Sequence, residues 1–154
     1  MRRLILALLV SSAMLSPACR EPRGRVELVP FPADTDLAPW IRAQVAARPG
    51  RAVLMYEGAS WCEPCNRFHE AARAGRLDAE FPTLTLLELD ADLDGEKLAS
   101  AGYFSELIPL FAVPAADGRA SGVQIEGGIK GDGAVDNVVT RLRPLIVQAT
   151  RNTQ

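Results

Sequence analysis

Three stretches of the chain are almost continuously apolar and have the length of buried strands. They span residues 52–56, 83–89 and 107–113. Apolar runs of about four to eight residues are typical of strands that are covered on both faces, as in parallel sheets. The shorter apolar stretches at 26–29 and 123–125 predict two more strands. The pattern therefore predicts a sheet whose central strands are buried on both sides.

Apolar residues spaced three and four apart predict helices between and after these strands. The clearest pattern lies near the end of the chain, where one apolar stripe runs from Val135 to Ala149. Pro144 falls inside this stripe and lacks a backbone donor, so we expect either a kink between Thr140 and Arg143 or two shorter helices. Three earlier helices are predicted between Asp36 and Pro49, from Cys62 to about Gly75, and over residues 96–101 after a loop at 90–95.

From residue 52 onward the predicted order of elements is strand, helix, strand, helix, strand, strand, helix. Strands that alternate with helices are typical of parallel pairing through a crossover helix. Asp117 and Gly118 indicate a tight turn between the last two strands. We therefore predict an α/β fold in which a parallel β-α-β unit is followed by a β-hairpin and a C-terminal helix.

The chain has 154 residues, a length that suits one domain, but its first residues have a different character. Arg2 and Arg3 precede an apolar run from Leu4 to Leu15. Small residues follow at Ser16 and Ala18. This pattern is typical of an export signal, and the run is shorter than the about 20 residues that cross a membrane. We therefore assign residues 1–18 to a signal peptide, 19–34 to a tether and 35–150 to the folded domain.

The charges of the chain are nearly balanced, with 17 Lys and Arg against 19 Asp and Glu and a net charge of −2 at pH 7. The sequence shows no cluster of basic residues, no repeat and no low-complexity tract. Nucleic acids bind basic surfaces, so they are not expected as partners.

The three cysteines, Cys19, Cys62 and Cys65, are an odd number that needs an explanation in an exported protein. The number is explained if Cys62 and Cys65 pair and Cys19 is modified. Cys19 follows Ala18 at the expected cleavage point, which resembles the lipobox of bacterial lipoproteins, whose cysteine becomes the lipid-bearing first residue. Lipoboxes usually have Leu three positions before the cysteine, where this chain has Ser16. We predict lipidation of Cys19, and the alternative is ordinary secretion with a free thiol there.

Cys62 and Cys65 stand two residues apart, between a predicted strand and a predicted helix. Cys62 would then occupy the helix N-terminus, where backbone N–H groups and the helix dipole stabilise a thiolate. A static disulfide would close a very short loop and stabilise little. A closed zinc site needs four ligands, and the only nearby third ligand is His69, while haem attachment needs His at the position of Asn66. The pattern favours redox chemistry, and no metal is predicted.

These features together resemble the thioredoxin-fold family. Residues 53–65 resemble the active-site strand of thioredoxins and the Trp-Cys-x-Pro-Cys motif that follows it. The family's cis-proline, hairpin turn and late glycines correspond to Ile108-Pro109, Asp117-Gly118 and Gly127-Gly128. The resemblance covers residues 35–149. It implies a three-layer fold around a mixed central sheet, and an activity that needs no cofactor besides a redox-active Cys62–Cys65 disulfide.

The resemblance also assigns roles to individual residues. In this family the first cysteine attacks a disulfide and the second releases the enzyme, which implies Cys62 as the nucleophile and Cys65 as the resolving cysteine. The cis-proline loop would present its backbone to an extended peptide in strand-like pairing. The residues that would bind the substrate or support the site are Trp61, Pro64, Ile108 and Pro109.

One position departs from the family pattern. Thioredoxins carry a buried Asp below the active site, which helps to move a proton from the resolving cysteine, and the matching residue here is Tyr56. Glu57 should point to the opposite face of the strand. We therefore expect Glu57, His69 or water to relay the proton, or reduction to be slower. Glu63, between the cysteines, is expected to disfavour the Cys62 thiolate slightly, because a nearby anion opposes a second negative charge.

The sequence therefore predicts a thiol–disulfide oxidoreductase that acts on thiols and disulfides of exported proteins or peptides, at the periplasmic face of a bacterial membrane. Pro before the second cysteine and Ile before the candidate cis-proline resemble reducing members of the family, so we expect a disulfide reductase. The compartment is oxidising, so electrons must come through a membrane thiol protein. Two alternatives stay open: a periplasmic thiol oxidase or isomerase, and a non-catalytic binding module with the same fold.

Overall fold

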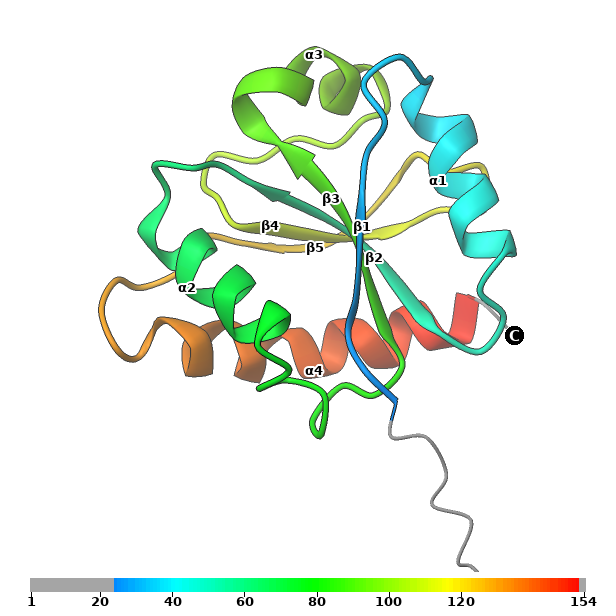
Figure 1. Cartoon of the computed structure of the whole chain (residues 1–154). Coiled ribbons are helices and arrows are strands. Elements are labelled where there is room, and N and C mark those ends of the chain that lie inside the picture. The colour runs from blue at the N-terminus through cyan, green and yellow to red at the C-terminus, as the bar shows by residue number, and fades with distance from the viewer. Residues whose placement is uncertain (1–23, 153–154) are drawn as a thin grey trace, which may run out of the picture.

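The computed structural model describes residues 24–152, which form one sheet with helices on both sides (Figure 1). The strands are β1 (Glu27–Pro30), β2 (Ala52–Gly58), β3 (Leu84–Asp90), β4 (Leu110–Pro114) and β5 (Ala120–Glu126). The helices are α1 (Leu37–Ala46), α2 (Glu63–Arg73), α3 (Ala91–Ser100) and α4 (Ala134–Asn152). The predicted α/β fold with a mixed central sheet is confirmed.

The strands lie in the order β1-β3-β2-β4-β5. β3 pairs in parallel with both β1 and β2, while β4 is antiparallel to β2 and to β5. β2 is therefore the central strand, with Tyr56 opposite Glu88 on β3 and Phe111 on β4. The hairpin between β4 and β5 turns at Gly118, whose φ of 85° explains why glycine stands there. The predicted parallel unit and hairpin are both present.

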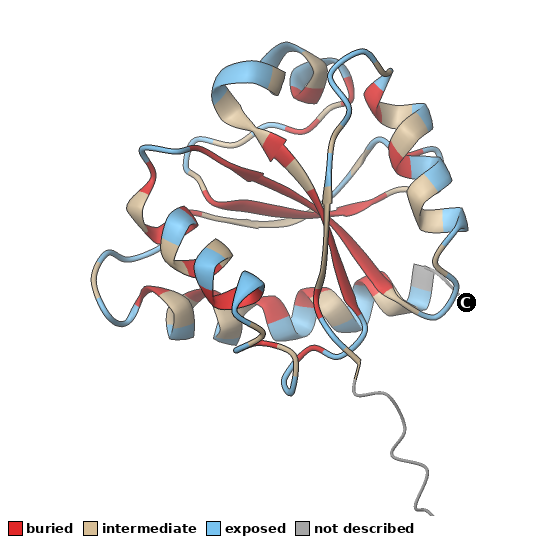
Figure 2. Ribbon diagram, viewed as in Figure 1, coloured by how far each residue is buried: buried red, intermediate tan, exposed pale blue. Residues whose placement is uncertain are grey.

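Each face of the sheet is covered by two helices. Leu54 and Tyr56 of β2 pack with α2 and α4, whereas the alternate residues Val53 and Met55 pack with α1 and α3. All seven residues of β2 are buried, and Figure 2 shows the burial concentrated in the strands and on the inner sides of the helices. Apolar residues occur on both faces of β2 because both faces are covered.

Helix α3 begins earlier than the sequence pattern predicts. The predicted loop over residues 90–95 is wrong, because the chain passes from β3 directly into the helix. Asp90 caps the helix, its Oδ1 accepting from the backbone N–H of Asp92 at 2.8 Å, and Asp94 accepts from the N–H of Asp90 at 2.9 Å. Acidic residues stabilise a helix N-terminus, so this acidic run starts a helix rather than a loop.

Two strand boundaries also differ from the prediction. β4 begins at Leu110, so the predicted start at residue 107 is wrong. Pro109 has no N–H to donate to the sheet, which is consistent with a strand that starts just after it. β1 pairs with β3 from Glu27 onward, so the sheet extends into the segment that the sequence analysis assigned to the tether.

Helix α4 is one continuous helix of 19 residues, so the predicted alternative of two shorter helices is wrong. Pro144 and Thr140 both lie on the exposed side of the helix. The carbonyl group that loses its partner to Pro144 is that of Thr140, and there water can reach it. Leu142 and Leu145 are buried against the sheet and hold the helix across this point. Neither α4 nor another helix within residues 24–152 is long and apolar enough to cross a bilayer.

Candidate active site

Cys62 is the N-cap of α2, as the sequence pattern predicts. Its backbone is extended, with φ −83° and ψ 104°, and the backbone N–H of Cys65 donates to its Sγ at 3.3 Å. The helix starts at the next residue, Glu63, and Pro64 occupies its first turn, where a missing N–H has no cost. The sulfur of Cys62 therefore lies at the positive end of the helix dipole.

Cys62 and Cys65 form a disulfide, with an S–S distance of 1.98 Å and Cα atoms 5.2 Å apart. Cys65 is 1% exposed and Cys62 is 5% exposed. Cys62 is less open than a residue at a free helix end, because Ala91 and Ile108 pack against it. Cys62 nevertheless lines a surface cavity, so it is the sulfur of the pair that lies nearer to an arriving substrate on that side.

The loop before β4 closes over this disulfide. The Ile108–Pro109 peptide bond is cis, as expected from the family resemblance. The carbonyl oxygen of Ile108 lies 3.7 Å from Sγ of Cys62. The carbonyl of Pro109 accepts from the N–H of Gly127 at 2.9 Å, which joins the loop to the segment that follows β5. The structure thus brings the predicted residues Ile108 and Pro109 to the cysteine pair.

The cavity beside Cys62 measures about 460 Å³ and has both apolar and charged walls. It is lined by residues from β2, α2, α3 and the loops before α2, β4 and α4: Glu57, Trp61, Cys62, Glu63, Pro64, Ala91, Ser105, Glu106, Leu107, Ile108, Gly128 and Lys130. Trp61 is 67% exposed, and its Nε1–H donates to Asp92 at 2.9 Å. Leu107 is also exposed. The predicted support residues Trp61 and Pro64 therefore border the same cavity as Cys62.

Glu63 is tied to groups outside the cysteine pair. Its carboxylate accepts from the Arg67 guanidinium and, at 3.1 and 3.2 Å, from the backbone N–H of Gly131. The hydrogen bond from Arg67 is the main reason why the pKa of Glu63 lies below its usual value. The charge of Glu63 is thus compensated by a cation, which reduces the repulsion of a Cys62 thiolate that the sequence analysis expected.

Glu57 lines the Cys62 cavity from the face of β2 opposite to Tyr56, as strand alternation predicts. It is 9% exposed, and its carboxylate accepts from the hydroxyl of Ser105 at 3.2 Å. Burial raises the pKa of Glu57, and the nearby Asp90 raises it further. The site therefore holds a carboxyl group that gains a proton more readily than an exposed one.

A second cavity, of about 380 Å³, lies on the side of Cys65. Tyr56 and His69 border it, together with Glu88, whose Oε1 lies 2.5 Å from Nε2 of His69. The Tyr56 ring stacks on the His69 ring with centroids 6.5 Å apart, and its hydroxyl donates to the carbonyl of Cys65 at 3.4 Å. Burial raises the pKa of Tyr56 above its ordinary value, so the phenol stays neutral. Tyr56 cannot take the place of an ionised carboxylate.

One predicted site residue, the lipidation candidate, has no described position. Cys19 lies outside the described residues. Within residues 24–152, no three His, Cys, Asp or Glu side chains gather in a way that could hold a metal ion.

The comparisons with known proteins find matches among solved structures only. No family model and no curated protein matches the chain. The structure matches thioredoxin from Trichomonas vaginalis with a TM-score of 0.51 and 21% identity, covering 79% of this chain and 96% of that one. The match to the short form of thioredoxin f from spinach chloroplast has a TM-score of 0.52 and 21% identity, and it covers 81% of this chain and 94% of that one. The match to a thioredoxin from Nicotiana alata has a TM-score of 0.53 and 13% identity, with the same coverage of 81% of this chain and 94% of that one.

The chain has the thioredoxin fold. Within this fold, the Cys62–Cys65 disulfide, the N-terminus of α2 and the cis Ile108–Pro109 bond lie together as the sequence resemblance implies. Tyr56, which the sequence resemblance matches to the buried Asp of thioredoxins, is itself buried, and its hydroxyl contacts the carbonyl of Cys65. The residue that the sequence analysis missed is Glu88. Only the register between β2 and β3 could have identified Glu88, because it places this residue opposite Tyr56.

Proposed function

We propose that this protein is a thiol–disulfide oxidoreductase that exchanges electrons with protein or peptide substrates through Cys62 and Cys65. The observation that supports this most strongly is the disulfide at the N-terminus of α2, 3.7 Å from the carbonyl of the cis-proline loop. The helix terminus stabilises the thiolate needed for attack, and the loop offers backbone groups to an extended chain.

We further propose that the protein works as a disulfide reductase on exported proteins. Pro64 before the second cysteine and Ile108 before the cis-proline resemble reducing members of the family. Apolar side chains exposed at the site, such as Trp61 and Leu107, suit a polypeptide substrate better than a small polar thiol.

Reduction would proceed in two exchanges. The thiolate of Cys62 attacks one sulfur of the substrate disulfide, a Cys62–substrate bond forms, and the other substrate sulfur leaves as a thiolate. The thiolate of Cys65 then attacks Sγ of Cys62, the Cys62–Cys65 bond forms, and the second substrate sulfur leaves. The substrate gains two electrons and two protons, and the cysteine pair loses them.

Trapping of the mixed disulfide tests the proposal. In a Cys65→Ser variant the second exchange cannot occur, so substrates should stay linked to Cys62 and be identified by mass spectrometry. A Cys62→Ser variant is the matched control, because it keeps Cys65 but lacks the attacking sulfur. Absence of mixed disulfides in the Cys65→Ser variant, with substrate disulfides present, would contradict the enzyme proposal and favour a binding module.

The reduction potential decides the direction. A value near that of thioredoxin, about −270 mV, would mark a reductant, and a value of about −120 mV would mark an oxidant. The difference of about 150 mV corresponds to about 7 kcal/mol, so equilibration with glutathione buffers separates the two. An oxidising value would replace the reductase proposal with the oxidase or isomerase alternative.

We also propose that the protein is exported and held at the periplasmic face of a bacterial membrane by lipid on Cys19, and that a membrane thiol protein supplies its electrons. The support is the signal-like start of the sequence, the cysteine directly after Ala18, and the oxidising nature of such a compartment. Labelling with a fatty acid analogue should mark the wild-type protein and fail in a Cys19→Ser variant. Labelling that persists in this variant contradicts the anchor.

A further inference from the structure

We infer that His69 accepts the proton of the resolving Cys65, and that Glu88 positions His69 for this task. The inference rests on the proposed disulfide exchange and concerns its second step, where Cys65 must lose a proton before it attacks. The thioredoxin position that carries an acid is occupied here by Tyr56, so another group has to do this work.

The placement of His69 relative to Cys65 follows from α2. The two residues are four positions apart on this helix, so they share one face, with Cβ atoms about 5–6 Å apart. Both line the cavity of about 380 Å³ on the side of Cys65. The proposed proton transfer would take place at this cavity, directly or through one water molecule.

Glu88 determines which nitrogen of His69 is available. Nε2 of His69 lies 2.5 Å from the Glu88 carboxylate, which can only accept a hydrogen bond when it is ionised. Nε2 then carries the hydrogen, and the lone pair of the neutral ring is on Nδ1. When Nδ1 takes a proton, the imidazolium keeps a charge-assisted hydrogen bond to Glu88.

The other candidates for this role are placed less well. Tyr56 stacks on the His69 ring and donates to the carbonyl of Cys65, and it remains a neutral phenol. Glu57 lies on the opposite face of β2 and lines the cavity of Cys62. The remaining titratable groups around the His69 cavity are Asp90 at the end of β3 and Asp94 on α3. Both are held at the start of α3, where they accept hydrogen bonds from backbone N–H groups.

The step balances as follows. The S–H bond of Cys65 breaks and its proton goes to Nδ1 of His69. The Cys65 thiolate forms a bond to Sγ of Cys62, and the bond between Cys62 and the substrate sulfur breaks. The electron pair leaves on the substrate sulfur, which takes the proton of the imidazolium directly or through water, and His69 returns to its neutral form.

The test uses the reduced protein and glutathione disulfide as the probe, with acid quenching and mass spectrometry to follow two species in time. The first is the Cys62–glutathione mixed disulfide, and the second is the Cys62–Cys65 disulfide. In a His69→Ala variant, formation of the first species should be unchanged, and its conversion to the second should be about 100-fold slower. Added imidazole should restore the conversion rate in this variant, because it supplies the missing base to the vacated space.

Glu88→Gln keeps the size of the side chain but removes its charge. It should slow the same conversion to a lesser degree, without rescue by imidazole, because the ring of His69 is still in place. Glu70→Gln is the matched control, since Glu70 is an exposed acid on α2 that lines the groove toward α4 instead of this cavity. It should convert at the wild-type rate. If His69→Ala does not fold, a His69→Asn variant serves the same comparison.

The results separate the inference from the function on which it rests. Conversion at the wild-type rate in His69→Ala overturns the inference, as does a slow conversion that imidazole leaves unchanged. Slower conversion in Glu57→Gln with normal conversion in His69→Ala also overturns it, because the role then belongs to Glu57. Failure of the proposed function itself would appear earlier, as an absence of the glutathione mixed disulfide in the wild-type protein.

Discussion

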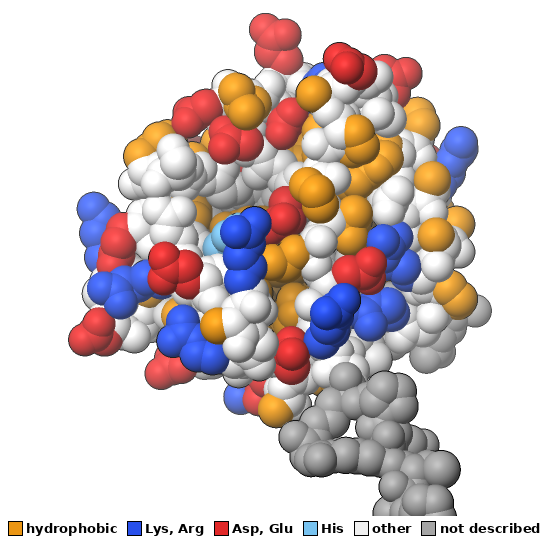
Figure 3. Space-filling model, viewed as in Figure 1, with side chains coloured by type: hydrophobic (Ala, Val, Ile, Leu, Met, Phe, Trp, Pro, Cys, Tyr) orange, Lys and Arg blue, Asp and Glu red, His pale blue; other side chains and the backbone are white. Residues whose placement is uncertain are grey.

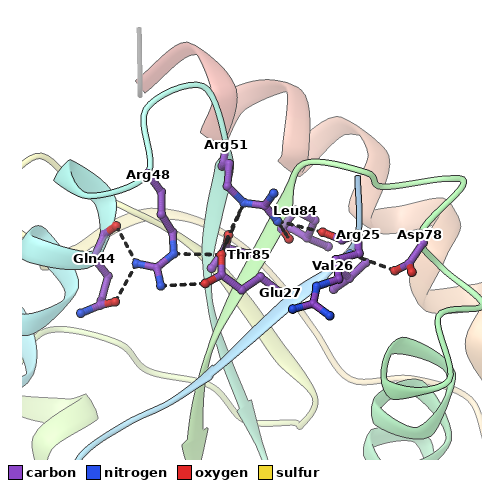
Figure 4. Close-up of polar contacts among 9 residues, drawn as sticks. All are labelled: Arg25, Val26, Glu27, Gln44, Arg48, Arg51, Asp78, Leu84 and Thr85. Carbon is purple, nitrogen blue, oxygen red and sulfur yellow. Dashed lines mark hydrogen bonds and ion pairs between the residues drawn. The ribbon is translucent and has the colours of Figure 1, made fainter. Parts of the chain in front are cut away.

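The two ends of the parallel strands differ sharply in how their polar groups are satisfied. At the amino ends of β2 and β3, Glu27, Arg48 and Arg51 form a connected network with buried Thr85 (Figure 4). At the carboxyl ends lie the cysteine pair, the cis-proline loop and Glu57. The first end joins β1 to the domain, and the second carries the proposed chemistry.

The network at the amino ends leaves little unpaired. Glu27 accepts two hydrogen bonds from Arg48, at 2.8 and 3.0 Å, and one from the Thr85 hydroxyl at 3.1 Å. Arg51 donates to the carbonyls of Leu84 and Arg25 as well as to Thr85. These contacts link β1, α1 and the ends of β2 and β3, which are far apart in sequence. They stabilise the edge of the sheet, where a short strand alone would be weakly held.

The carboxyl ends are arranged differently. Apolar side chains stay exposed there, Trp61 and Phe104 at 67% each, and the buried carboxyl of Glu57 is partnered by a hydroxyl group. On the face drawn in Figure 3, charged side chains of both signs alternate over the lower half, whereas those near the top are mainly acidic. The comparison shows that charged groups join the strands at the amino ends, whereas apolar side chains stay exposed at the carboxyl ends, beside the proposed catalytic cysteines.

The largest expected effect is the loss of the attacking sulfur. Cys62→Ser should abolish turnover of a disulfide substrate, because no thiolate remains at the helix N-terminus. Serine is a favourable N-cap, so the unfolding free energy should stay close to that of the reduced wild-type protein. An insulin reduction assay and denaturant unfolding measure the two quantities. Residual turnover above that of buffer would show that the carboxyl-end chemistry does not depend on Cys62.

At the amino ends the opposite outcome is expected. Thr85→Val keeps the shape of a fully buried side chain but removes its hydrogen bonds to Glu27 and Arg51. The unfolding free energy should fall by about 1–2 kcal/mol, as for hydrogen bonds to charged groups, and kcat/KM should not change. Urea unfolding should show a lower midpoint with the same slope. A drop in turnover instead would mean that the two ends are coupled.

The stability of the protein should depend on pH in opposite ways through Glu27, at the amino ends, and Glu57, at the carboxyl ends. The hydrogen bond from Arg48 is the main reason why the pKa of Glu27 lies below its ordinary value of 4.5. Its contribution is therefore fully present above pH 4.5 and is lost as the pH falls through the folded-state pKa. Burial raises the pKa of Glu57 above 4.5, so the folded state binds the proton more tightly, and stability falls as the pH rises through that raised value.

The matched variants are Glu27→Gln and Glu57→Gln. At neutral pH the first should lose up to about 1 kcal/mol, since its ion pair is partly exposed, while the second should gain stability because no charge remains to be buried. Thermal unfolding between pH 4 and 8 checks both signs. If stability changed with pH equally in the two variants, the proposed contrast between the ends of the sheet would be wrong.

The smallest expected effect concerns Trp61. Removing its exposed ring in Trp61→Ala should raise KM for a protein disulfide about threefold, which is about 0.7 kcal/mol, and leave stability within about 0.5 kcal/mol. Val147→Ala, an exposed apolar residue on α4, is the control and should change neither. An unchanged KM in Trp61→Ala would limit the substrate surface to the cis-proline loop.

The sequence predicted those parts of the molecule that local patterns determine. The apolar run at 52–56, the cysteines at a helix start and the turn at Gly118 each depend on neighbours in the chain. The position of Ile108-Pro109 opposite Cys62 came from family resemblance, not from any local pattern. The predicted core of the β-α-β unit was therefore confirmed, and the cis bond was found at the expected peptide.

The missed parts depend on contacts between distant segments. Glu88 meets His69 only because β3 aligns with β2 in one register, and a shift by one residue would turn Glu88 to the other face. Glu27 finds Thr85 across 58 residues of sequence. The continuity of α4 through Pro144 depends on packing against the sheet, which outweighs the local preference to break.

The described chain begins at the amino end of β1, and this position limits the distance between the active site and a membrane anchor at Cys19. β1 and β2 are both parallel to β3. The described chain therefore begins at the amino ends of these strands, whereas Cys62 comes after the carboxyl end of β2 (Figure 1). If Cys19 bears lipid, the seven residues 20–26 span at most about 25 Å, and the length of β2 adds about 23 Å. The active site would then lie at most about 50 Å from the bilayer. An electron donor would have to present its thiol within that distance of the membrane surface.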